Sequence, residues 1–116
     1  MNVLAWILGI ALAGVFGVAG ITKVLDLDRA RDHFGYAKRE FQLIGLAEIL
    51  GAAGVVVGLV WRKVEWLGGA AAIALGCLLV GALMAHARVG DDAKKIIPAI
   101  VMLVVAIVFV VALSLR

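Results

Sequence analysis

Four apolar runs, each close to twenty residues long, alternate with charged connections along this chain. They cover residues 3–22, 41–61, 64–87 and 96–115. A helix needs about twenty apolar residues to cross the hydrocarbon core of a bilayer, whereas an isolated strand in lipid would leave its backbone groups unpaired. The sequence therefore predicts an all-α, integral membrane four-helix bundle, built as one domain over residues 1–116.

The composition supports a membrane environment. Hydrophobic residues make up 66% of the 116 residues, and a soluble domain this small cannot bury that much apolar surface. The net charge of +3 comes from basic residues that flank the apolar runs, where they contact lipid headgroups. The lipid bilayer is therefore the expected partner, and the charge pattern does not favour nucleic-acid binding.

The distribution of Lys and Arg predicts the orientation of the bundle. Eight of the eleven basic residues lie in the connections 23–40 and 88–95. The positive-inside rule places those two connections in the cytoplasm and both chain termini outside. We therefore expect the protein in the plasma (inner) membrane of a prokaryote.

The connection 23–40 is long, and apolar side chains alternate in it with charges. This pattern predicts a short amphipathic helix at the membrane interface near Asp28–Phe34, broken by Gly35. A solvated loop is the alternative interpretation.

Glu48 lies within the apolar run 41–61, in which Gln42 is the other polar residue. An ionisable group within a span costs roughly 2.5–3.5 kcal/mol on insertion scales, so it usually faces the bundle interior and has a partner. Alternating helix directions bring Glu48 to the same side of the membrane as two other polar residues, Lys23 and His86. The candidate cluster of ligand-binding or proton-active groups therefore comprises Glu48, His86 and Lys23, extended by Arg88 and Asp91.

Each of these residues also has a structural interpretation. Lys23 is a typical helix-end anchor, and His86 lies about one turn from the interface. A salt bridge that only holds helices together would account for the cluster without any chemistry. The sequence contains no catalytic signature and leaves enzymatic activity open.

Metal and thiol chemistry are not indicated by the sequence. The two histidines, His33 and His86, and the one cysteine, Cys77, do not have the spacing of a metal site. Cys77 is expected to be a small packing residue within its helix. No covalently bound cofactor is predicted.

Three stretches resemble the DoxX-like family of small four-helix membrane proteins. They are GVAGITKVL (17–25), IGLAEILGAAGVVVGL (44–59) and LLVGALMAHARVGDDAKKIIPAIVML (78–103). The family takes its name from a subunit of a thiosulfate:quinone oxidoreductase. The resemblance implies a quinone as cofactor, a membrane oxidoreductase complex as partner, and Lys23, Glu48 and His86 as recurring polar positions.

The leading hypothesis is an accessory or ligand-binding protein, for a quinone or a lipid, associated with a membrane oxidoreductase system. One alternative is a small proton-coupled transporter that uses Glu48, for which an antiparallel homo-oligomer would be expected. The other is a non-catalytic assembly factor for membrane proteins. A cavity beside Glu48 would favour the first hypothesis, and a fully packed bundle the last.

Overall fold

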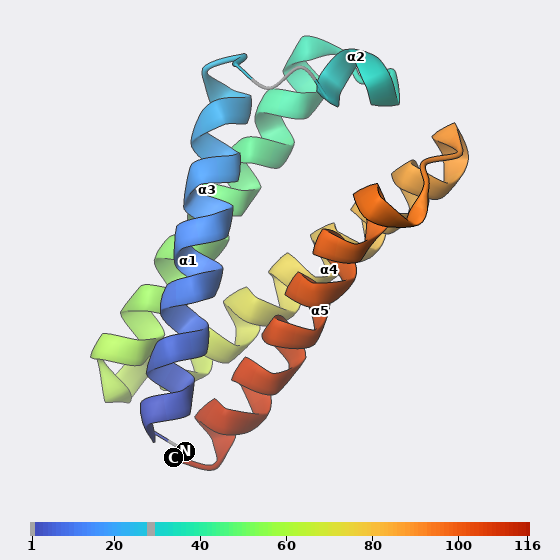
Figure 1. Cartoon of the computed structure of the whole chain (residues 1–116). Coiled ribbons are helices and arrows are strands. Elements are labelled where there is room, and N and C mark those ends of the chain that lie inside the picture. Colours follow the sequence, from blue (N-terminus) through green and yellow to red (C-terminus); the bar gives the residue numbers. More distant parts are fainter. Residues whose placement is uncertain (1, 28–29) are drawn as a thin grey trace.

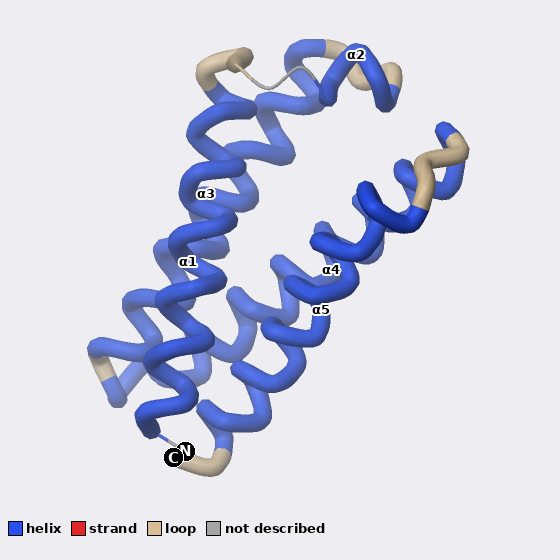
Figure 2. Tube along the Cα trace, in the orientation of Figure 1, coloured by secondary structure: helices blue, strands red, loops and turns tan. Residues whose placement is uncertain are grey.

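The structure is a computed structural model that describes residues 2–27 and 30–116 (Figures 1 and 2). Within these residues there is no strand, and the helices follow one another with short connections. The elements are α1 (Asn2–Val24), α2 (Ala30–Phe34), α3 (Lys38–Val60), the 3-10 turn η1 (Arg62–Val64), α4 (Glu65–Val89) and α5 (Ala93–Ser114).

Four of these helices, α1, α3, α4 and α5, are long and apolar enough to cross a membrane. Their bounds agree with the predicted spans to within three residues at each end. Many large apolar side chains on them face outward, among them Val18, Ile73 and Ile107. Such a surface is stable in lipid and not in water. The predicted all-α membrane bundle is thereby confirmed.

The short helix predicted near Asp28–Phe34 is present as α2 over Ala30–Phe34. Asp28 lies outside the described residues. Gly35 ends the helix with a φ of +76°, a conformation that glycine adopts without the steric cost of a side chain.

The four long helices form a ring in which each contacts two neighbours. α1 packs on α3, α3 on α4, α4 on α5, and α5 on α1. The largest fully buried side chains come one from each helix; they are Leu12, Val55, Leu75 and Phe109. The apolar core therefore lies along the axis of the ring.

Two close approaches between glycines set how the helices diverge. Gly20 of α1 meets Gly45 of α3, where an added Cβ on Gly45 would stand 2.7 Å from the Gly20 carbonyl oxygen. Gly58 of α3 meets Gly68 of α4, where an added Cβ would collide with the backbone. The first contact lies near α2 and the second near the chain termini. α3 runs beside α1 and meets α4 near the chain termini, and α4 and α5 lean away toward the α2 end (Figure 1).

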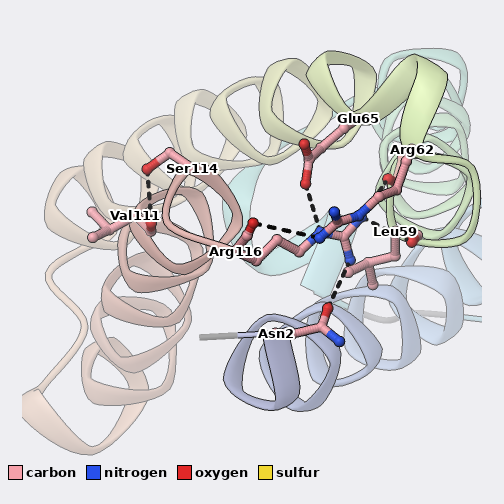
Figure 3. A network of polar contacts seen from close by, with 8 residues as sticks. Asn2, Leu59, Arg62, Glu65, Val111, Ser114 and Arg116 are labelled. Carbon is pink, nitrogen blue, oxygen red and sulfur yellow. Dashed lines mark hydrogen bonds and ion pairs between the residues drawn. The ribbon is translucent and has the colours of Figure 1, made fainter.

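A buried arginine ties the helices together at the end that holds the termini (Figure 3). The Arg116 Nε donates to Glu65 Oε1 at 2.5 Å, and Nη2 donates to the Leu59 carbonyl oxygen at 3.0 Å. Nη1 lies 3.4 Å from Asn2 Oδ1. These bonds satisfy a carbonyl at the C-terminal end of α3, which has no partner within the helix. They connect α1, α3 and α4 with the end of α5.

Candidate functional site

A cavity of about 520 Å³ lies inside the bundle at the α2 end. Its walls come from α1 (residues 15–23), α3 (41–48), α4 (77–86) and α5 (98–102), and Phe34 and Tyr36 also line it. All four helices contribute only the half nearer to α2. The divergence of the helix pairs therefore opens this space.

The cavity wall is apolar except for a few side chains, of which Lys23 and Glu48 form an ion pair. The Lys23 Nζ lies 2.9 Å from Glu48 Oε1 and 5.2 Å from the centroid of the Phe41 ring. Glu48 is 5% exposed. The prediction that this carboxylate faces the bundle interior and has a partner is confirmed.

The local sequence explains why Lys23 reaches Glu48. Gly45 lies one turn before Glu48 on α3, and its missing Cβ leaves room for the Lys23 Cβ, which would be 2.6 Å away. Gln42, a further turn back, donates from Nε2 to the Val24 carbonyl oxygen at 2.9 Å. This bond satisfies a carbonyl at the end of α1 and fixes that end of α1 against α3.

A second polar group joins two histidines through one carboxylate. Asp91 Oδ2 lies 2.6 Å from His86 Nδ1, and Oδ1 lies 2.7 Å from His33 Nε2. The Asp91 side chain is 4% exposed, and Lys95 Nζ lies 3.7 Å from Oδ1. Three elements therefore converge on this carboxylate: α2, α4 and the start of α5.

The turn after α4 places Asp91 beside His86. Gly90 has a φ of +74°, and the Asp91 N–H donates to the His86 carbonyl oxygen at 3.0 Å. This arrangement is a common way to end a helix at glycine. It folds the chain back so that the carboxylate of Asp91 meets the imidazole of His86.

The surroundings of Asp91 favour its ionised form. Burial alone would raise the pKa of this carboxyl, but the hydrogen bonds with His86 and His33, and the charges of His33 and Lys95, outweigh it. The net effect is a pKa below the ordinary value of 3.8. Asp91 is therefore a carboxylate that accepts two imidazole N–H groups near neutral pH.

α2 and the residues after it cover the end of the cavity. The Arg88 Nη2 donates to the Phe34 carbonyl oxygen at 2.6 Å, and the Phe34 ring meets the His86 ring edge-on at 5.0 Å. Tyr36 stacks on Phe41 at 5.7 Å. These contacts hold an aromatic cover over the polar end of the cavity.

The model of one known family matches this chain. It is described as the DoxX-like family, and it matches residues 5–109. This chain belongs to the DoxX-like family. No curated protein and no solved structure matches the chain.

Every residue that lines the cavity falls within the part of the chain that matches the DoxX-like model. The resemblance drawn from the three sequence stretches is thereby confirmed. Of the site residues predicted in this DoxX-like protein, Lys23, Glu48 and His86 all line this cavity. Arg88 and Asp91 stand behind its wall, where they hold Phe34 and His86. The functional roles of all five stay predictions.

Three residues that contribute to the site were missed by the sequence analysis. His33, Phe34 and Tyr36 lie in the connection 23–40, for which the sequence predicts an interfacial helix and no part in the site. The signal in the sequence was the density of aromatic and imidazole rings in a short helix. Only the tertiary structure shows that this helix lies on α4.

The expectation that Cys77 is a packing residue was wrong. Cys77 is exposed and lines the cavity, so it does not fill space between packed helices. Within residues 2–27 and 30–116, no group of three or more His, Cys, Asp and Glu side chains is arranged to hold a metal ion.

Proposed function

We propose that this protein binds a quinone or a lipid with a comparable headgroup, as an accessory component of a membrane oxidoreductase system. The observation that carries the proposal is the 520 Å³ cavity beside the Lys23–Glu48 pair. Ligand pockets usually measure about 300–1,000 Å³ and are apolar with a few placed polar groups. The volume and the walls of this cavity match that description.

The two parts of the cavity suit the two parts of such a ligand. The apolar walls from α1, α4 and α5 accept a hydrocarbon tail, and the polar end offers an ammonium group and an imidazole to ring oxygens. The rings of Phe34, Tyr36 and Phe41 line that same end, and aromatic faces favour offset or edge-on contact with a planar headgroup.

The same observations weigh on the alternative functions. A transporter that cycles protons on Glu48 would have to break its ion pair with Lys23, and an antiparallel dimer would have to bring two such pairs together. An assembly factor needs no internal space. The cavity therefore supports ligand binding above both alternatives.

We also propose that the α2 end faces the cytoplasm of a prokaryotic cell, with the protein in the plasma membrane. This end carries the connections with eight of the eleven Lys and Arg residues. In that orientation the polar end of the cavity lies near the cytoplasmic headgroups, and the two termini lie together on the opposite side (Figure 1).

The test is binding of decylubiquinone to the protein in nanodiscs, compared between two glycine variants. Gly81 lines the cavity, and a Cβ added there meets no atom within 4 Å. Gly14 is equally unhindered and lies away from the cavity. The Gly81→Phe variant therefore adds a ring at the cavity wall, whereas Gly14→Phe adds the same ring away from the cavity.

We expect Gly81→Phe to weaken decylubiquinone binding at least about tenfold, equivalent to about 1.4 kcal/mol, and Gly14→Phe to leave it unchanged. Mass spectrometry of lipid extracts should find a co-purifying ligand with the wild type and Gly14→Phe and lose it with Gly81→Phe. Equal binding by the two variants, or no binding and no co-purifying molecule, would refute the proposed function.

A further inference from the structure

The His33–Asp91–His86 group connects the protein surface with the cavity. The side chain of His33 is 43% exposed, that of Asp91 is 4% exposed, and that of His86 is 17% exposed. His86 lines the cavity, whereas Asp91 and His33 do not. The cavity therefore meets only one imidazole of this group, and the carboxylate stands behind it.

The chemistry of the group fixes which nitrogen of His86 carries the proton. An ionised carboxylate only accepts hydrogen bonds, and a neutral imidazole has one N–H and one bare nitrogen. Since Nδ1 lies 2.6 Å from Asp91 Oδ2, Nδ1 must be the donor. Neutral His86 then presents a bare Nε2, which is a hydrogen-bond acceptor, as in other carboxylate–histidine pairs.

The second histidine stabilises this arrangement from the opposite side of the carboxylate. His33 Nε2 donates to Oδ1, so both oxygens of Asp91 are engaged and the carboxylate cannot turn away from His86. The other charged groups around the pair come from each packed element: Lys95 on α5, Arg88 on α4, and Lys23 and Glu48 across the cavity.

On the basis of the proposed function, we infer that His86 makes the cavity selective for ligands with a hydroxyl group at the ring, such as a quinol, over the corresponding quinone. A quinol O–H donates to the bare Nε2. A quinone carbonyl has no proton to donate, so it forms no hydrogen bond with this acceptor. Asp91 is the positioning residue, because it sets the tautomer of His86.

The experiment measures the affinities of decylubiquinol and decylubiquinone for the protein in nanodiscs at pH 8. We expect the wild type to prefer the quinol roughly tenfold, the typical effect of one hydrogen bond. The quantity compared is the ratio of the two affinities, which a general loss of stability does not change.

Two variants separate positioning from mere structural support. Asp91→Asn introduces an amide that can present either its oxygen or its NH₂ group to His86, so both tautomers of His86 become accessible. The preference for decylubiquinol over decylubiquinone at pH 8 should then fall below about threefold. Lys95→Gln removes another charge next to Asp91 and leaves both histidines in place, so the ratio should stay near the wild-type value. The ¹⁵N spectrum of labelled histidines at pH 8 should show His86 protonated at Nδ1.

The outcomes distinguish this inference from the proposed function. Binding of both probes with equal affinity at pH 8, or an unchanged ratio in Asp91→Asn, would overturn the role of His86 and leave the ligand-binding cavity intact. A bare Nδ1 on His86 in the ¹⁵N spectrum would overturn the inference without any ligand. Absence of binding by both probes would refute the proposed function and this inference together.

Discussion

The ion pair between Lys23 and Glu48 offers a quantitative test of how the site is built. The perturbation is a double-mutant cycle with Glu48→Met, Lys23→Met and both changes together, since Met is unbranched and similar in length to either side chain. At the observed 2.9 Å, two unit charges attract each other by about 6 kcal/mol at an effective dielectric constant of 20. Much of this attraction is offset by desolvation, because both side chains are largely buried.

Each single change leaves one buried charge without its partner. The expected loss is about 3–5 kcal/mol in the free energy of unfolding for either single variant. The double variant removes both charges and puts apolar groups in their place, which is often neutral or stabilising. Its free energy of unfolding should therefore be within about 1 kcal/mol of the wild-type value, because the apolar Met side chains replace the lost contacts.

The assay is reversible unfolding of the purified protein in mixed micelles with increasing SDS, followed by far-ultraviolet circular dichroism. Lys38→Met is the control: the Lys38 side chain is 61% exposed and lies 4.0 Å from Asp26, so its loss should cost less than about 1 kcal/mol. If the two single effects simply add in the double variant, or if Glu48→Met costs no more than Lys38→Met, Lys23 and Glu48 do not form a coupled buried pair.

Two further predictions concern the contact between α1 and α3 and the turn after α4. Gly45→Ala should lower the free energy of unfolding by about 1–3 kcal/mol, because the added Cβ would stand 2.7 Å from the Gly20 carbonyl oxygen. Gly14→Ala is the control and should not be destabilising, because a Cβ there meets no atom within 4 Å. Equal losses of stability in the two variants would show that the Gly20–Gly45 contact is not tightly packed. The low pKa of Asp91 means that its ionised form stabilises the fold above pH 3.8 and that this contribution disappears as the pH falls through the lower, folded-state pKa. The free energies of unfolding of the wild type and of Asp91→Asn, measured between pH 6 and pH 2, should therefore become equal only below pH 3.8. If they become equal above pH 5, the Asp91 contacts do not stabilise the fold in this way.

Much of the site could be predicted because it depends on charge within apolar segments. Glu48 stands out in an apolar run, and the cost of burying a charge in lipid requires it to face inward. The alternation of spanning helices then puts Lys23 and His86 at the same level. The length of the runs and the order of the charges are enough to place these three residues.

The partners of the polar groups were harder to predict. His86 was considered together with Glu48, whereas the structure places its Nδ1 against Asp91. That pairing depends on the left-handed conformation of Gly90, which returns the chain onto the last turn of α4. The position of His33 depends on where α2 lies, and a five-residue helix has too little periodicity for its packing face to be read from the sequence.

Residue type and run length are enough to predict the membrane bundle, the bounds of its four spans and the inward direction of Glu48, because they govern the transfer of apolar and charged groups into lipid. The presence of a cavity depends instead on how the helices pack. Its opening follows from two glycine contacts, at Gly45 and Gly58, that lie at opposite ends of α3 and hold it to different neighbours. Which small residues meet a neighbouring backbone is a property of helix rotation and crossing, and many equally spaced glycines compete for that role in the sequence.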